Sequence, residues 1–252
     1  MENSKLLHYV RHWVTWSLLL IVIARILLPT PILPERLDFS GKKEKNAELE
    51  ALAGDLPVVF TGSFQGASKY HFFTGKEAFV LSAIDRRQTQ FDIWQKELQF
   101  QGKPVFVPQW GRAVESFQSV NRVKINYTLP RTEVQAGDTL MIPFEIHNPS
   151  THAIDFGHPE FPVTLKAAYI LKREIDLADC LLSNPISYII ANQTINKCQL
   201  MTIVPDLSSG EYQFTLTLVD PLSAARNSAY LPLKINADSR TPLKQSPLAD
   251  TD

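Results

Sequence analysis

The chain has 252 residues, and its 25 Lys and Arg residues are nearly balanced by 26 Asp and Glu residues, which leaves a formal net charge of −1. Hydrophobic residues make up 44% of the chain and there are only two cysteines. This composition excludes an intrinsically disordered chain and a disulfide-scaffolded miniprotein. The near-zero charge gives no reason to expect nucleic acid as a partner, and the length allows one or two domains.

The first predicted element is a membrane helix at residues 9–28. Trp13 to Leu28 reads WVTWSLLLIVIARILL and is followed by prolines at positions 29, 31 and 34. About 20 helical residues span a bilayer. Arg25 would cost about 2.5 to 3.5 kcal/mol near the bilayer centre, but it lies one turn from the helix end and can extend to the interface. The bilayer is therefore a predicted partner.

Two alternatives to a membrane anchor stay open. A cleaved signal peptide would have a similar apolar core, although no small-x-small cleavage site follows Ala24. A buried core helix of a soluble protein is the other alternative, which the lack of a polar face disfavours. Basic residues lie on both sides of the segment, so flanking charge does not predict its orientation.

After a linker at residues 29–46, the pattern predicts a small α/β subdomain at residues 47–120. Asn46 to Gly54 is typical of a short helix. Short apolar runs at Pro57 to Phe60, Ala78 to Leu81 and Pro104 to Val107 are typical of buried strands with helices between them. No glycine-rich phosphate motif follows the first strand, and no cofactor is predicted.

From residue 121 the pattern becomes alternating, which predicts an immunoglobulin-like β-sandwich at residues 121–236. Apolar and polar residues alternate at residues 123–127, 140–146, 212–218 and 231–235. Tyr212, two residues after Gly210, is placed to close a corner of such a sandwich. Residues 237–252 lack any periodicity and are predicted to be a flexible tail. The predicted fold class is therefore α+β, with one N-terminal transmembrane helix.

An ordered set of motifs lies between residues 60 and 107: Phe60-Thr61-x-Ser63-Phe64-Gln65-x-Ala67-Ser68-x-Tyr70, Phe73-Thr74-Gly75-Lys76, Gln90-x-Asp92-x-Trp94, and Gly102-Lys103 before a strand. This set resembles the segment after the last membrane helix in bacterial glycosyltransferases of the dolichyl-phosphate-mannose protein mannosyltransferase type, relatives of the lipid A aminoarabinose transferase. The resemblance covers about a quarter of the chain. Gly62 and Ala83 to Asp85 depart from it, where a polar residue and a more aromatic stretch are expected.

The resemblance implies the last membrane helix and the extracytoplasmic, periplasmic domains of such an enzyme. The catalytic carboxylate of the family lies in a many-helix membrane domain, so the resemblance implies an accessory or substrate-positioning role with no catalytic residue here. It also implies a multi-helix glycosyltransferase membrane domain or a polyprenyl-phosphate-sugar as a partner. Whether the chain is an enzyme is left open. The alternative is a membrane-anchored extracytoplasmic binding or adaptor protein that uses the β-sandwich.

Two groups of residues are candidates for ligand binding or docking. One follows the first predicted strand, where open α/β layers place ligands, and the other is a dense polar and aromatic cluster in which arginines could engage a phosphate and a tryptophan could stack on a sugar ring. The alternatives are domain docking for the first group and a solvated helix start for the second. The candidates are Ser63, Gln65, Lys69, Tyr70, Arg86, Arg87, Gln90, Asp92 and Trp94.

The cysteines and histidines give weaker signals. Cys180 and Cys198 are a candidate disulfide in an oxidising compartment, where the bridge would contribute about 3 kcal/mol, and would be buried thiols in a reducing one. His147, His152 and His158 lie around Asp155, but their spacing does not enforce a zinc site, so a polar loop is expected and no metal is predicted.

Overall fold

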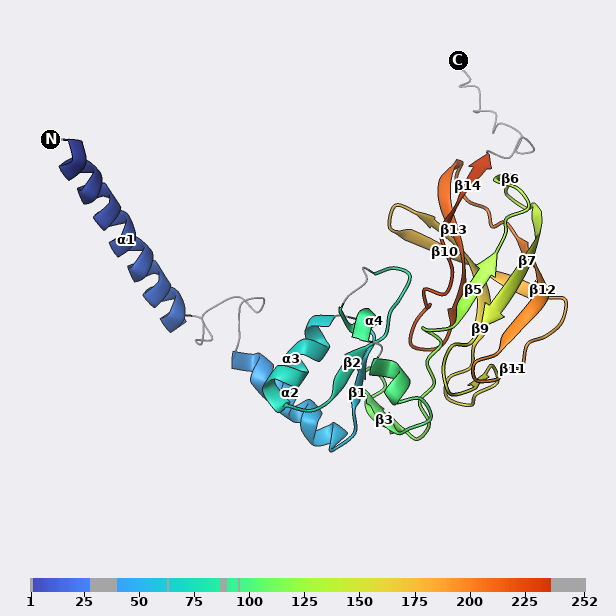
Figure 1. Ribbon diagram of the computed structural model, residues 1–252, viewed down its shortest axis with the longest axis horizontal. Coiled ribbons are helices and arrows are strands. Elements are labelled where there is room, and N and C mark those ends of the chain that lie inside the picture. Colours follow the sequence, from blue (N-terminus) through green and yellow to red (C-terminus); the bar gives the residue numbers. More distant parts are fainter. Residues whose placement is uncertain (1, 28–39, 63, 87–89, 95, 237–252) are drawn as a thin grey trace, which may run out of the picture.

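The computed structural model describes residues 2–27, 40–62, 64–86, 90–94 and 96–236. It has an α+β architecture: an apolar N-terminal helix, a small mixed sheet with helices, and a large curled sheet that is mostly antiparallel (Figure 1). The predicted flexible tail and most of the predicted linker lie outside the described residues.

Helix α1 (Glu2–Leu27) contains the predicted membrane segment except for Leu28, which lies outside the described residues. Residues His8–Ile26 are long and apolar enough to cross a membrane, and none of them is buried against the described chain. This exposure argues against the core helix of a soluble protein. A signal sequence and a membrane anchor both fit a helix of this length, composition and exposure.

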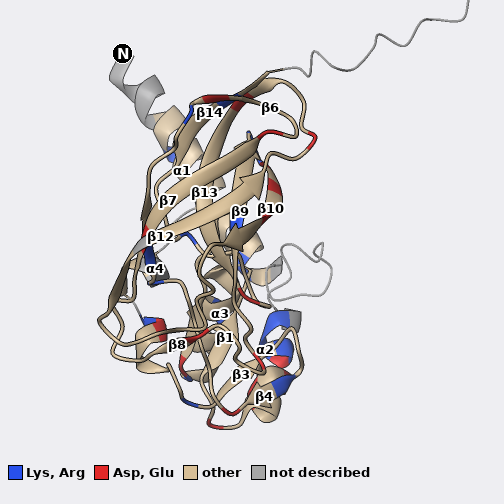
Figure 2. Ribbon diagram, turned by 90° about the vertical axis from the view of Figure 1, so that its right-hand side faces the viewer, with Lys and Arg blue, Asp and Glu red and all other residues tan. Residues whose placement is uncertain are grey.

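The small sheet contains the three predicted strands and one more. In the described part of the chain its order is β2-β1-β3-β4, with β1 parallel to β2 and β3 and with β4 antiparallel to β3. Helices α2 and α3 pack against each other beside this sheet (Figure 1), and Figure 2 places several Lys and Arg residues on α2. The elements are α2 (Ser40–Ala53), β1 (Val58–Phe60), α3 (Phe64–Thr74), β2 (Ala78–Val80), α4 (Gln90–Trp94), the 3-10 helix η1 (Lys96–Gln99), β3 (Val105–Val107) and β4 (Arg112–Val114).

The strands of this sheet read as continuous apolar runs because both of their faces are covered. Every residue of β2 and β3 is buried, as are Val58 and Val59 of β1. Burial on both faces removes the polar half of the period-two pattern.

The large sheet follows the order β5-β7-β12-β10-β9-β13-β14-β6 among the described residues. Its strands are β5 (Lys124–Tyr127), β6 (Glu133–Gln135), β7 (Thr139–His147), β9 (Thr164–Leu171), β10 (Glu174–Leu182), β12 (Thr194–Ile203), β13 (Gly210–Val219) and β14 (Leu231–Asn236), and β8 (Ile154–Asp155) pairs separately with β11 (Tyr188–Ile189). The four predicted strand segments correspond to β5, β7, β13 and β14. Strands β6, β8, β9, β10, β11 and β12 were not predicted.

Strand β10 lets the sheet curl over its own core. Its first part, Glu174 to Asp179, pairs with β9, and its last part, Cys180 to Leu182, pairs with β12. The inner faces of both halves supply one apolar cluster, which includes Ile142 of β7 and Leu216 of β13. One continuous sheet therefore encloses the core of this domain.

Tyr212, near the start of β13, bonds to the turn that precedes this strand. The Tyr212 hydroxyl donates a hydrogen bond to the backbone oxygen of Ser208 at 2.9 Å. The ring is buried in the core of the curled sheet, so the bond ties the turn before β13 to the core.

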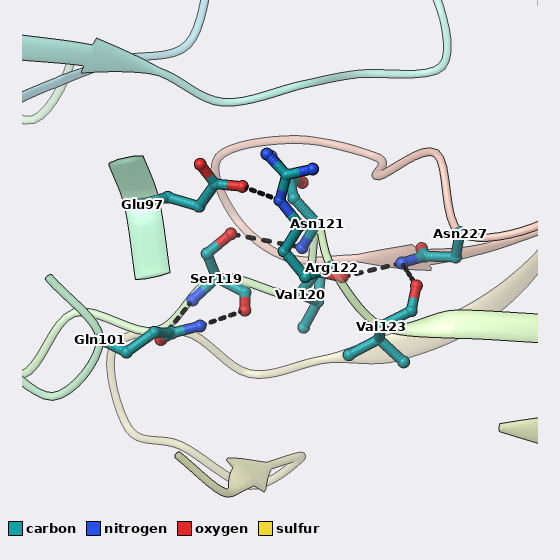
Figure 3. Close-up of polar contacts among 8 residues, drawn as sticks. All are labelled: Glu97, Gln101, Ser119, Val120, Asn121, Arg122, Val123 and Asn227. Carbon is teal, nitrogen blue, oxygen red and sulfur yellow. Dashed lines mark hydrogen bonds and ion pairs between the residues drawn. The ribbon is translucent and has the colours of Figure 1, made fainter. Parts of the chain in front are cut away.

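A clamped segment joins the two domains (Figure 3). Gln101 and Ser119 exchange two hydrogen bonds of 2.6 and 3.0 Å, and Arg122 Nε donates to Glu97 Oε1 at 2.5 Å. Asn227 Nδ2 donates to the backbone oxygens of Val120 and Val123, each at 2.8 Å. The connection between the domains is thus held from both sides.

Candidate functional site

A pocket of about 340 Å³ lies at the carboxyl ends of the parallel strands β1 and β2, where the two domains meet. We call it the Arg86 pocket. Ligands of open α/β sheets commonly bind outside the carboxyl ends of the strands. Its lining residues are Thr61, Ala83, Ile84, Asp85, Arg86, Ile175, Leu177, Leu222, Ser223 and Ala224.

Arg86 is the main positive group of this pocket. Its Nη1 donates to the backbone oxygens of Thr61 and Gly62 just after β1, and its Nε lies 3.6 Å from Asp85 Oδ2. The Nη2 group has no hydrogen-bond partner within the described residues. These contacts fix the guanidinium while leaving donors available to an anionic ligand.

The other wall of the pocket comes from the curled sheet and is joined to the first by one backbone bond and one side-chain bond. Ile84 N donates to Ala224 O at 2.9 Å, and Arg226 Nη2 donates to Arg86 O at 2.6 Å. Ile175 and Leu177 of β10 add aliphatic surface. The pocket therefore has an aliphatic wall facing a polar edge.

The loop after β13 contains an unusual buried carboxyl group. Asp220 is 6% exposed, and its Oδ1 accepts the N–H groups of Leu222 and Ser223 at 2.7 and 2.8 Å. Its Oδ2 and the Ser223 hydroxyl are buried without a partner in the described structure. Burial raises the pKa of Asp220 from 3.8 to about 6, although the two N–H bonds oppose this shift.

This raised pKa predicts a pH dependence of stability. Because the folded state binds the Asp220 proton more tightly than the unfolded state, the protonated form stabilises the fold at low pH, and this contribution is lost between about pH 4 and pH 6. The loss of folding stability is at most about 3 kcal/mol.

The variant Asp220→Asn should be more stable than the unmodified chain above pH 6 and equal to it near pH 4. Urea unfolding across this range, with Asp206→Asn as the exposed control, measures the difference; equal slopes with pH in both chains would contradict the assignment.

The structure does not bring the binding-site residues predicted from sequence together in one place. Arg86 lines the pocket, whereas Gln65, Lys69, Gln90 and Trp94 do not. Ser63 and Arg87 lie outside the described residues, as does the side chain of Asp92.

Tyr70 is a core residue of the small domain and not a surface group. Its side chain is fully buried, its ring centroid lies 6.1 Å from that of Phe60, and its hydroxyl has no hydrogen-bond partner in the described structure. Burial raises the pKa of Tyr70. The same helical face that carries Ala67 carries Tyr70 three residues later, which turns both side chains inward.

The candidate disulfide is not formed, and both thiols are free. Cys180 on β10 pairs with Thr202 on β12, four positions beyond Cys198. Four residues of strand span about 13 Å, which exceeds the Cα separation of a disulfide. Burial raises the pKa of the Cys180 thiol to about 11, so this group stays protonated at neutral pH.

Among the described residues, no group of three His, Cys, Asp or Glu side chains is placed to hold a metal ion. His147 bonds to Thr194 on the neighbouring strand at 2.9 Å, while His152 and His158 lie in another part of the domain, beside a cleft that is described below.

Sequence reasoning missed most of the pocket. Asp220 and Pro221 carry a turn signal directly after a strand, but this signal does not reveal that the carboxyl group is buried. Ile175 and Leu177 carry no signal for a site, because an apolar residue in a strand is expected in the core.

No protein-family model matches the chain, and no curated protein matches it in sequence. Solved structures that share some likeness include the alkylpurine DNA glycosylase AlkC of Pseudomonas fluorescens (8% identity, 46% of this chain and 31% of that chain, TM-score 0.29). Another is a family 123 glycoside hydrolase of Clostridium perfringens (13% identity, 46% of this chain and 26% of that chain, TM-score 0.19). A third is the E. coli chaperone DraB (12% identity, 44% of this chain and 53% of that chain, TM-score 0.19). The chain thus spans 26 to 53% of their length. At these TM-scores the likeness carries no argument about the function of this chain.

Proposed function

We propose that the chain is a membrane-anchored accessory module of a lipid-linked-sugar glycosyltransferase, with its two folded domains on the extracytoplasmic side. In this role it positions a polyprenyl-phosphate-sugar or docks on a multi-helix membrane domain. The residues that suggested this family, from Leu56 to Val107, contain β1, α3, β2, α4, η1 and β3 of the small domain. The immunoglobulin-like assignment of the curled sheet belongs to the same proposal, and the bond from Tyr212 to Ser208 supports it.

The observation that carries the proposal is the Arg86 pocket. A sugar phosphate needs charge-assisted donors for its anionic oxygens, and Arg86 provides a guanidinium that its backbone contacts hold in place. The aliphatic wall made by Ile175 and Leu177 suits the first carbons of a prenyl chain. An apolar helix at the N-terminus would keep the domains close to the membrane where such lipids reside.

The exposed residues near this edge agree with a docking role. Phe64 on α3 and Ile93 and Trp94 on α4 are exposed large apolar side chains, and both helices begin after the carboxyl ends of strands that meet at the pocket edge. Exposed aromatic residues of this kind are enriched at interfaces. A transferase membrane domain or the lipid surface could cover them.

The test is binding of a short-chain polyprenyl-phosphate-sugar to the full chain reconstituted in nanodiscs. We expect saturable binding, and we expect Arg86→Ala to weaken it about tenfold or more because charge-assisted hydrogen bonds to the phosphate are lost. Arg173→Ala removes an exposed arginine at the turn between β9 and β10 and should leave binding unchanged. Circular dichroism of each variant verifies folding. Absence of binding by the folded, unmodified chain would exclude the positioning of a polyprenyl-phosphate-sugar.

A second candidate, the adaptor role, is supported by an apolar row on the outer face of the curled sheet. Leu181 pairs with Met201, and Met201 pairs with Met141, so three strands contribute neighbouring side chains. Leu181 and Met141 are exposed, and Ile203 extends the row by two positions. Contiguous exposed apolar surface of this kind marks protein contacts. If lipid-linked sugar does not bind, this row becomes the leading functional surface.

A further inference from the structure

A second cleft, of about 300 Å³, lies between the domains and shares no lining residue with the Arg86 pocket. We call it the His158 cleft. Ser116, Phe117 and Gln118 contribute to it from the segment that leads into the curled sheet, and His152, Asp155, His158 and Tyr188 contribute from the loops around β8 and β11. We infer that this cleft binds a single neutral sugar ring.

The first support is that the scaffold of the cleft is rigidly bonded. Gln118 is 5% exposed, and its amide donates to Asp155 O at 2.8 Å and to Phe161 O at 3.3 Å while its Oε1 accepts Asp155 N at 2.9 Å. Asp155 is also paired with Tyr188 across the β8–β11 ladder. The backbone that carries the lining groups is thus held before any ligand arrives, which reduces the entropic cost of binding.

The second support is that the local bonding determines the tautomer of His158. Its Nδ1 accepts the N–H groups of Glu160 at 3.2 Å and Phe161 at 3.1 Å. A nitrogen that accepts hydrogen bonds carries no proton, so the proton of the neutral ring is on Nε2. His158 therefore offers a ligand a donor and no acceptor.

The third support is the set of groups that remain available beside this donor. Asp155 Oδ1 accepts the N–H of Gly157 at 2.8 Å, and Oδ2 has no partner in the described chain. Ser116 and Tyr188 are exposed, and their side-chain hydroxyl groups make no hydrogen bond to the described residues. Together the cleft presents one fixed donor, one anionic acceptor, two hydroxyl groups that can donate or accept, the second imidazole of His152 and the aromatic ring of Tyr188.

These groups match a pyranose or furanose ring better than other ligand classes. Each sugar hydroxyl is both a donor and an acceptor, and the carboxylate and the imidazole N–H satisfy these two roles separately. The Tyr188 ring offers an apolar face for the C–H groups of the sugar. An anion is disfavoured because Asp155 is among the lining residues and neither Lys nor Arg is. The volume is at the low end for ligand pockets, which suits a single ring.

The test uses the full chain in nanodiscs, because glucoside and maltoside detergents would compete for the cleft. Saturation-transfer NMR with glucose, galactose, mannose, N-acetylglucosamine and arabinose should detect at least one binder with a dissociation constant of about 1 mM, as expected for a ligand of about a dozen heavy atoms. We expect Asp155→Asn, which keeps the oxygen that Gly157 needs, to weaken binding about tenfold. Tyr188→Ala should weaken it by a similar factor.

Two controls separate this site from the Arg86 pocket. Asp206→Asn removes an exposed carboxylate elsewhere on the curled sheet domain, and Arg86→Ala alters only the first pocket; neither should change monosaccharide binding. The inference is overturned if none of the five sugars binds to the folded chain, or if Asp155→Asn and Tyr188→Ala bind as tightly as the unmodified chain. Since the inference does not use Arg86, it can fail while the proposed function stands, and the reverse also holds.

Discussion

Replacement of Asn227 by Ala should destabilise the curled sheet domain by about 3 kcal/mol. Asn227 Nδ2 donates to the backbone oxygens of Val120 and Val123, and its Oδ1 accepts the N–H of Leu218 at 2.7 Å. All three backbone groups belong to residues that are at most 2% exposed, so water cannot replace the amide. Each buried group left without a partner costs about 1 kcal/mol or more.

The measurement is thermal unfolding of the full chain in a detergent micelle, followed by circular dichroism. For a chain of this size, the midpoint should fall by about 6 to 12 °C. Asn126→Ala is the matched control, because Asn126 is exposed on β5 and makes no side-chain hydrogen bond to the described chain. A change in Asn227→Ala no larger than that in the control would show that this amide does not hold the connection in place.

Replacement of Arg122 by Ala should have a comparable effect at the junction between the domains. Glu97 is 4% exposed and its carboxylate accepts from Arg122 Nε (Figure 3). Loss of the arginine leaves a buried carboxylate without its cationic partner, and breaking such a pair typically costs 3 to 5 kcal/mol. We expect about 3 kcal/mol, because the Arg122 side chain retains 23% exposure.

A double variant tests whether the loss of stability in Arg122→Ala comes from the unpaired, buried carboxylate of Glu97. The double replacement Glu97→Met with Arg122→Met removes both charges and should recover most of the stability. Lys76→Ala provides the comparison with an ion pair at the surface, since Asp55 is 99% exposed and such pairs contribute less than about 1 kcal/mol. If Arg122→Ala and Lys76→Ala lose the same stability, burial of Glu97 is not what makes the pair matter.

The Arg86 pocket and the His158 cleft both lie at the junction between the two domains. The Arg86 pocket presents a cation beside aliphatic side chains, and the His158 cleft presents neutral and anionic hydrogen-bonding groups beside an aromatic ring. Both are formed where the small sheet meets the curled sheet. Both sites therefore require a stable junction between the domains, which Asn227 and Arg122 support. The variants Asn227→Ala and Arg122→Ala should not be used to compare ligand binding.

The sequence by itself determined the elements whose burial is regular. Leu140, Ile142, Phe144 and Ile146 alternate with exposed residues along β7, so the period of two is intact. Val58 to Phe60 is a continuous apolar run because Val58 and Val59 are fully buried and Phe60 packs against the same core. The apolar run of α1 needs no tertiary partner at all to be recognised.

The strands that were missed have irregular burial for tertiary reasons. In β9, Ala167, Ala168 and Tyr169 are all buried, because the outer face of this strand is covered as well as the inner face. In β10, Leu177 and Leu181 face outward, which breaks the alternation. The alternation of apolar and polar residues along one strand does not show whether a distant segment of the chain covers its outer face.

Only the tertiary structure decided where the sites lie. The sequence marked Arg86 as part of a dense charged cluster, but the opposite wall of its pocket comes from residues about 90 to 140 positions later, including Leu177 and Ala224. His158 gained its defined tautomer from the N–H groups of Glu160 and Phe161, and its cleft from Gln118. Local propensity acts over a few residues, whereas a binding site requires segments distant in sequence to be packed together, and that packing is set by burial of the shared core.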